Sequence, residues 1–131
     1  MAMRIARILV AAVVLASSAA LADIKRHASV PEALQGTWGA GADGCKPDDK
    51  SLIVLAAKTY TGANAKCSID WVSETASPKG AVFSAHMQCA APPAQKASVS
   101  NLIIRPDSGD KISVGADFSH LTAYQRCPAK P

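Results

Sequence analysis

The sequence predicts an all-β fold, a small up-and-down antiparallel barrel of about seven or eight short strands tied by two disulfides. Short apolar runs recur about every ten residues and are separated by Gly, Pro, Asp and Ser. Two central runs alternate apolar and polar residues with period two, as half-buried strands do. The four cysteines are even in number, and no long amphipathic helical pattern is present. A β-sandwich is the alternative arrangement of the same strands.

The first 22 residues predict a secretory signal peptide. Arg4 and Arg7 give a positive start, residues 8–16 are uncharged and apolar, and Ala20-Leu21-Ala22 matches the small-x-small cleavage pattern. The apolar run is too short for a bilayer span, which needs about 20 residues. We therefore expect cleavage after this leader and export to the periplasm or beyond the cell. No membrane insertion of the mature chain is expected. A retained amphipathic anchor is the alternative.

The mature chain would be one small domain with little net charge. We expect a flexible arm over residues 23–34 and a single β-barrel domain over 35–131, acting as a monomer. Hydrophobic residues make up 49% of the chain and charged residues 18%, which is a globular composition. The leader contains two of the 14 basic residues and none of the 10 acidic ones, so a net charge of +2 remains. This weak charge argues against nucleic acid as a partner and gives no case for an anionic membrane surface.

The cysteines predict structural disulfides. All four, Cys45, Cys67, Cys89 and Cys127, follow the predicted leader. An even number in an exported chain indicates two bridges. The alternative, a zinc site, needs closely spaced ligand pairs, which these cysteines do not form. Each bridge across a long loop would add about 2–4 kcal/mol, chiefly by restricting the unfolded chain.

The first elements are short. The arm over 23–34 contains at most one helical turn, at Pro31-Glu32-Ala33-Leu34. Strands are expected over residues 35–39, 51–56 and 59–61, because apolar and β-branched residues there lie between turn-rich segments.

The central hairpin has the clearest pattern. A turn centred on Pro78 would pair residues whose numbers sum to 156, and one face would then contain every large residue of both strands. His86 would face away from that buried face. The predicted pairs are Trp71 with Ala85, Ile69 with Met87, and Cys67 with Cys89.

The C-terminal half predicts a second hairpin and barrel closure. Strands over 102–105 and 111–115 flank a turn at 106–109, and a last strand covers 121–127. Residues 90–96, with Pro92-Pro93, are expected to be a loop. Closing the meander brings the first strand beside the last, so we predict the bonds Cys45–Cys127 and Cys67–Cys89, one of three connectivities.

A family resemblance appears at the first and last strands. Gly36-Thr37-Trp38 resembles the G-x-W signature of the lipocalin-like (calycin) barrels, and Arg126 resembles the arginine that those barrels place over the tryptophan at the closed end. Such a cation–π contact is worth about 0.5–2 kcal/mol, and the guanidinium can also bond carbonyls at the barrel base. The alternative is that Trp38 is a plain core anchor and Arg126 a surface charge.

Residues 29–38 resemble the arm-to-barrel junction of the small periplasmic inhibitors of secreted metalloproteases. In that family the free N-terminus enters the protease cleft and approaches the zinc. The resemblance therefore implies that Asp23, Ile24, Lys25 and Arg26 bind the partner. The chain departs from the family in having four cysteines where two are expected and in having a charged arm.

No catalytic, cofactor or metal site is predicted. The carboxylates fall mainly in turns, where Asp is common for backbone reasons, and no acid–base pair is defined. No nucleophile elbow or nucleotide-binding glycine motif occurs. The three histidines, His27, His86 and His120, are expected at the surface, with a three-histidine metal site as the alternative.

The sequence is compatible with more than one arrangement of the barrel interior and with more than one function. Trp71, Phe83 and Met87 would either fill the barrel or line a ligand pocket, and a filled interior is the expectation. The expected function is that of an exported, non-enzymatic binding protein of the inhibitor type, whose partner is a secreted hydrolase such as a protease. The alternatives are a carrier of small apolar ligands in the lipocalin manner, or an envelope structural or stress protein without a dedicated ligand.

Overall fold

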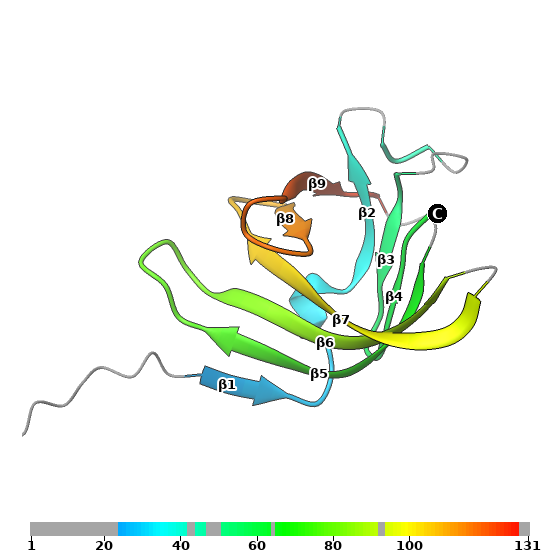
Figure 1. Ribbon diagram of the computed structural model, residues 1–131. Helices are drawn as coiled ribbons and strands as arrows, with labels where there is room; N and C mark the ends of the chain where they lie inside the picture. The colour runs from blue at the N-terminus through cyan, green and yellow to red at the C-terminus, as the bar shows by residue number, and fades with distance from the viewer. Residues whose placement is uncertain (1–23, 42–43, 47–50, 64, 92–93, 129–131) are drawn as a thin grey trace, which may run out of the picture.

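The computed structural model describes residues 24–41, 44–46, 51–63, 65–91 and 94–128 (Figure 1). The predicted leader and Asp23 lie outside them. No helix in this part of the chain is long and apolar enough to cross a bilayer. The elements are β1 (Ile24–His27), a short 3-10 helix η1 (Glu32–Leu34), β2 (Gly36–Ala40), β3 (Ile53–Leu55), β4 (Thr59–Thr61), β5 (Lys66–Thr75), β6 (Val82–Ala91), β7 (Ala94–Pro106), β8 (Lys111–Gly115) and β9 (Thr122–Arg126).

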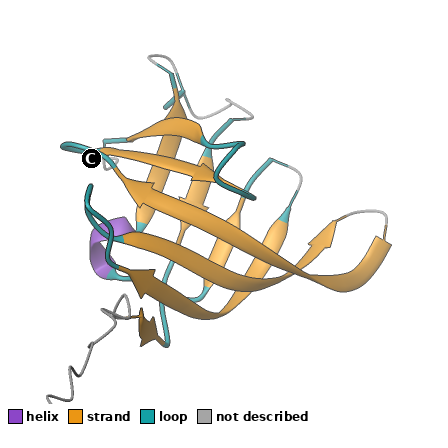
Figure 2. Ribbon diagram, turned by 60° about the vertical axis from the view of Figure 1, so that its left-hand side comes forward, coloured by secondary structure: helices purple, strands orange, loops and turns teal. Residues whose placement is uncertain are grey.

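Strands β2 to β9 form a closed antiparallel barrel in sequence order. Each strand pairs with the next along the chain, and β9 pairs with β2 to complete the ring. Figure 2 shows these strands as one curved wall with η1 at one end of the barrel. The predicted up-and-down barrel is therefore confirmed, and the sandwich is excluded.

The segment predicted as a flexible arm begins with a strand. β1 pairs antiparallel with β5, from Ile24 opposite Thr75 to His27 opposite Val72. This pairing has a physical reason: β5 is ten residues long, whereas β4 on the same side covers only its first three, Lys66–Ser68. β1 pairs backbone groups of β5 that would otherwise form an open edge. The prediction of one helical turn at residues 31–34, at the end of the arm, is confirmed by η1.

A β-bulge in β5 makes the pairing of β5 with β6 differ from the predicted register after Ile69. The predicted pairs Ile69–Met87 and Cys67–Cys89 are confirmed. The register then shifts by one residue, so Trp71 lies opposite His86 and Val72 takes the place opposite Ala85. Because one extra residue reverses which side chains face inward, Val72 is fully buried and Trp71 lies on the outer face.

Residues 90–96 are mostly strand, and the prediction of a loop there is wrong. β6 continues to Ala91, β7 starts at Ala94, and these two residues pair with each other. Pro92 and Pro93 lie outside the described residues. Proline breaks a ladder only at its own position, so the strands on either side continue to pair.

Both predicted disulfides are present. Cys45–Cys127 joins two positions 82 residues apart, and its Cα atoms are 5.3 Å apart. Cys127 also donates its backbone N–H to the carbonyl of Thr37 over 2.9 Å, so this bond lies beside the β2–β9 closure. Cys67–Cys89 joins directly opposite residues of β5 and β6.

The core is a single cluster inside the barrel. Its largest fully buried side chains come from the N-terminal segment and from strands all around the ring. The largest fully buried side chains are Trp38, Leu55, Met87, Ile104, Ile112, Val30 and Val72.

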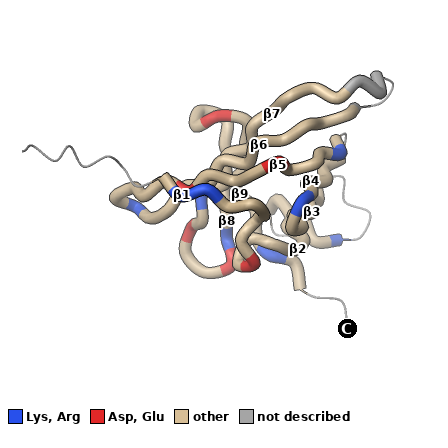
Figure 3. The backbone as a smooth tube through the Cα atoms, turned by 90° about the horizontal axis from the view of Figure 1, so that it is seen from below, with Lys and Arg blue, Asp and Glu red and all other residues tan. Residues whose placement is uncertain are grey.

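Charged positions are dispersed along the chain, although β1 carries two adjacent cations (Figure 3).

Candidate functional site

Trp38 and Arg126 lie against each other at one end of the barrel, and both line a hollow of about 590 Å³ there. The guanidinium carbon lies 4.3 Å from the indole centroid. Arg126 also donates Nη1–H to the carbonyl of Gln35 over 2.7 Å and Nη2–H to that of Ala33 over 2.6 Å. The indole N–H of Trp38 donates to the carbonyl of Leu34 over 3.1 Å. Nε of Arg126 lies 3.5 Å from Oδ1 of Asp110. This end therefore has the contacts that the resemblance implies, and they join the last strand to the backbone around η1.

Gly36 belongs to the same arrangement. Its φ of +139° lies where side chains are disfavoured, and a Cβ there would lie 2.8 Å from Nη1 of Arg126. The glycine of the G-x-W motif thus lets the guanidinium pass close to the backbone.

The residues predicted as a ligand pocket do not come together. Met87 is buried at the other end of the barrel, Phe83 faces inward near η1, and Trp71 lies outside. Trp71 is enclosed between two side chains: Arg26 lies 4.5 Å from its ring centroid, and the His86 ring stacks on it at 4.0 Å and 10°. Nδ1 of His86 is 3.2 Å from Oδ1 of Asn101. This outer row fastens β1 onto the barrel.

The residues predicted to bind a partner lie in or before β1. Ile24, Lys25 and Arg26 are exposed but are held in the β1–β5 ladder, and Asp23 lies outside the described residues. Of the histidines, His86 faces outward as predicted and His120 is exposed, whereas His27 is half-buried with its Nε2 3.3 Å from Oε1 of Glu74. Within the described residues, no three His, Cys, Asp or Glu side chains form a group that could hold a metal.

The other end of the barrel has a hollow of about 460 Å³. Two tyrosines, Tyr60 and Tyr124, lie in its wall, and neither hydroxyl has a hydrogen-bond partner among the described residues. Burial raises the pKa of Tyr60, and the nearby Tyr124 raises it further; burial also raises the pKa of Tyr124. Other lining residues are Cys67, Met87, Cys89, Ser98, Ser100, Leu102, Val114, His120 and Thr122. We call this hollow the mouth.

The sequence pattern does not single out either tyrosine, because their positions follow from pairing with other strands. Tyr60 pairs with Leu55 and with Cys67, which are both buried, and Tyr124 pairs with the buried Ile112. Directly paired residues point to the same side of a sheet. The observed strand pairing therefore places both phenols inside the barrel.

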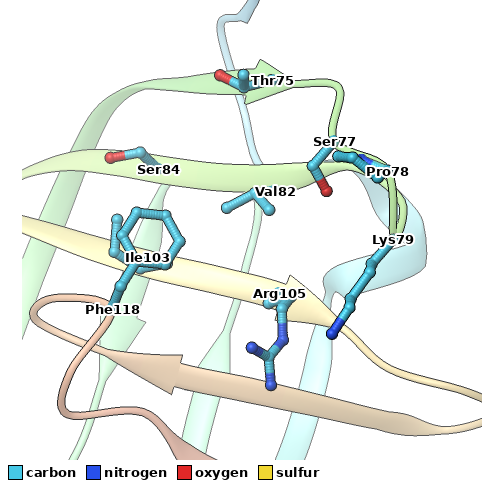
Figure 4. A pocket seen from close by; sticks show the side chains of 9 residues that line it. All are labelled: Thr75, Ser77, Pro78, Lys79, Val82, Ser84, Ile103, Arg105 and Phe118. Carbon is cyan, nitrogen blue, oxygen red and sulfur yellow. The ribbon is translucent and has the colours of Figure 1, made fainter.

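A second hollow lies on the outer face of β5, β6 and β7 and is shown in Figure 4. It measures about 580 Å³. Val82 and Ile103 form its apolar floor, and Phe118, from the β8–β9 connection, lines one end. Lys79 and Arg105 lie at the other end (Figure 4). Further lining residues are Thr75, Ser77, Pro78 and Ser84. We call this hollow the outer groove.

Comparisons with known proteins return no match: no family model, no curated protein and no solved structure is similar enough to the chain to count as one. The likeness to lipocalin-like barrels and to protease inhibitors therefore rests on the residues described above. The fold itself is defined by the strand pairing and the disulfides: it is a closed eight-stranded antiparallel barrel with two disulfides.

Proposed function

We propose that this chain is an exported binding protein that holds a small, partly apolar molecule in the mouth of its barrel. Disulfides persist in oxidising compartments, so the two bonds support a periplasmic or extracellular location. The mouth is the observation that carries the proposal. It contains two phenols whose hydroxyls have no hydrogen-bond partner among the described residues, and its volume is in the range of about 300–1,000 Å³ that is usual for ligand sites.

The lining of the mouth indicates the class of ligand. Met87, Leu102 and Val114 supply apolar wall, and the Cys67–Cys89 bond adds polarisable sulfur. The phenols of Tyr60 and Tyr124 have no hydrogen-bond partner among the described residues, and at neutral pH each is protonated and can donate a hydrogen bond. The ligand that fits this lining is an uncharged apolar molecule with a hydrogen-bond acceptor such as a carbonyl group.

Nile red, an uncharged apolar dye with a carbonyl, is a suitable probe. We expect its fluorescence to rise on binding to the oxidised mature chain with micromolar affinity. Ser100→Phe would place a large ring in the mouth and abolish this rise. Ser68→Phe, on the exposed face of β5, is the matched control and should leave it unchanged. Absence of dye binding, or equal binding by both variants, would remove the proposal.

A second candidate is engagement of a secreted hydrolase, the partner that the inhibitor resemblance implies. The observation that favours it is the edge of the sheet at β1. Among the described strands β1 pairs with β5 alone, so its other edge can accept a strand from a partner. Ile24, Lys25 and Arg26 would then act as part of a strand, not as a free arm.

This candidate is tested with a zinc metalloprotease and a micromolar excess of the mature chain. Inhibition that disappears when residues 23–27 are deleted would support it, provided that the shortened chain keeps its near-UV circular dichroism. No inhibition by the intact mature chain would dismiss it.

A further inference from the structure

We propose that the outer groove is a second binding site, which takes a single hydrocarbon chain ending in a carboxylate. The groove lies outside the barrel. Phe83 and Ile104 face the core, so the alternating residues Val82, Ile103 and Arg105 face outward and line the groove.

The floor of the groove is apolar where a strand surface that faces water is usually polar. Val82 and Ile103 lie on neighbouring strands, and Phe118 remains 65% exposed beside them. A large aromatic ring beside an apolar floor forms a contiguous apolar surface in water, and surfaces of this kind are favoured sites for an apolar ligand.

Phe118 is held in place by a structured turn. The carboxylate of Asp117 accepts the backbone N–H of Ser119 over 2.8 Å and lies 2.8 Å from Nδ1 of His120. A Cβ at Gly115 would overlap the carbonyl of His120, so glycine allows the turn to fold back against β8. The wall of the groove is therefore positioned before any ligand arrives.

The opposite end of the groove is cationic. Lys79 and Arg105 lie there together (Figure 4). Arg105 is oriented by Asp107, whose Oδ1 is 3.4 Å from Nε, and by Ser113, whose Oγ is 3.4 Å from Nη2. Its Nη1 has no hydrogen-bond partner among the described residues. Two cations against one carboxylate leave a net positive charge, which a ligand carboxylate would neutralise.

The sheet beneath the groove argues for a hydrocarbon chain over a peptide. β6 and β7 are each paired on both sides, so the floor has no free strand edge for a peptide backbone. A hydrocarbon needs no such partner. A volume of about 580 Å³ is sufficient for an alkyl chain of medium length.

Isothermal titration of the oxidised mature chain with monomeric dodecanoate tests this proposal. We expect saturable binding by dodecanoate and none by dodecyltrimethylammonium, which has the same chain and the opposite charge. Lys79→Glu and Phe118→Ser should each weaken binding roughly threefold to tenfold, since each removes one contact at an exposed site.

Matched changes on the other side of the barrel are the controls. Lys58→Glu and Val54→Ser also alter an exposed lysine and an exposed apolar residue, and they should leave the affinity unchanged. The mouth-filling variant Ser100→Phe should also bind dodecanoate normally, which separates this site from the mouth. The proposal would be overturned by no binding, by equal binding of the cationic amphiphile, or by binding that only Ser100→Phe removes.

Discussion

Trp38 and Arg126 are direct partners across the β2–β9 seam, and the guanidinium of Arg126 lies over the indole of Trp38. The same guanidinium bonds the carbonyls of Ala33 and Gln35 on either side of the last residue of η1. One side chain thus joins the last strand, the first barrel strand and the helical turn before it. This contact fixes η1 against one end of the barrel, beside a hollow of about 590 Å³, and the mouth is a separate hollow.

Replacing Arg126 should destabilise the fold. Arg126→Ala removes the cation–π contact and two charge-assisted hydrogen bonds, so we expect a loss of about 2–3 kcal/mol in the free energy of unfolding, measured in urea. Arg126→Lys should recover only part of this, because an ammonium group lacks the planar fork that reaches both carbonyls. Lys58→Ala is the exposed control, expected within about 0.5 kcal/mol of the wild type. An Arg126→Ala variant with the same free energy of unfolding as the wild type would contradict this role of Arg126.

Gly36 and Gly80 give a matched comparison of backbone strain with a steric clash. Both have positive φ, +139° and +117°, but a Cβ at Gly80 meets nothing within 4 Å. Gly80→Ala should therefore cost only the backbone strain, about 1 kcal/mol. Gly36→Ala should cost clearly more, because its Cβ would displace Arg126. Equal losses for the two variants in urea unfolding would show that the guanidinium shifts aside freely.

The two disulfides should contribute unequally to stability. In the chain-entropy model, a loop of 82 residues gives about 4.5 kcal/mol and one of 22 residues about 3.4 kcal/mol. The midpoint temperature of thermal unfolding should therefore fall more in the double variant Cys45→Ala, Cys127→Ala than in the double variant Cys67→Ala, Cys89→Ala. The reverse order would contradict the chain-entropy model and would mean that the Cys67–Cys89 bond stabilises the folded state directly.

Stability should fall in alkaline solution because of the mouth tyrosines. Burial raises the pKa of Tyr60 and of Tyr124 above the unfolded value of about 10. The stabilisation is complete below the unfolded pKa and is lost as the pH rises from there through the folded pKa values. In that range the unfolded chain has lost its phenolic protons while the folded chain still holds them. Tyr124→Phe should flatten this decrease.

A spectrophotometric titration checks the same point directly. The chain has two tyrosines, and both line the mouth, so phenolate absorbance reports on the mouth alone. We expect the native protein to ionise at higher pH than the protein unfolded in urea. Coincident curves would mean that the mouth does not desolvate its phenols.

The row Arg26–Trp71–His86 should hold β1 in place. Trp71→Ala removes both ring contacts, and hydrogen exchange at the amides of β1 should become faster while that of β2 stays unchanged. Arg26→Ala should have a smaller effect in the same direction. Unchanged exchange in β1 would show that backbone pairing alone fastens this strand.

Much of this fold could be predicted from local pattern. Period-two alternation located β5 and β6 and gave the Cys67–Cys89 pair, and the order of the strands gave Cys45–Cys127. These features depend on short-range alternation and on simple closure of a meander, which a sequence displays directly.

What could not be predicted depends on contacts between distant segments. The bulge before Trp71 was hidden because Trp71 and Val72 are both apolar, so alternation did not decide which one faces inward. The pairing of β1 with β5 joins residues 45 to 51 positions apart, and nothing local in Lys25-Arg26-His27 signals it. The mouth became visible only when separate strands brought Tyr60 and Tyr124 together.

Heteronuclear NMR of the oxidised mature chain during titration with Nile red would locate the bound dye residue by residue. We expect saturable shifts at residues of the mouth, with Tyr60, Leu102 and Tyr124 among the largest, and little change around Trp38 and Arg126. Shifts confined to the surroundings of Trp38 and Arg126 or to the outer face, or no shifts at all, would contradict binding in the mouth.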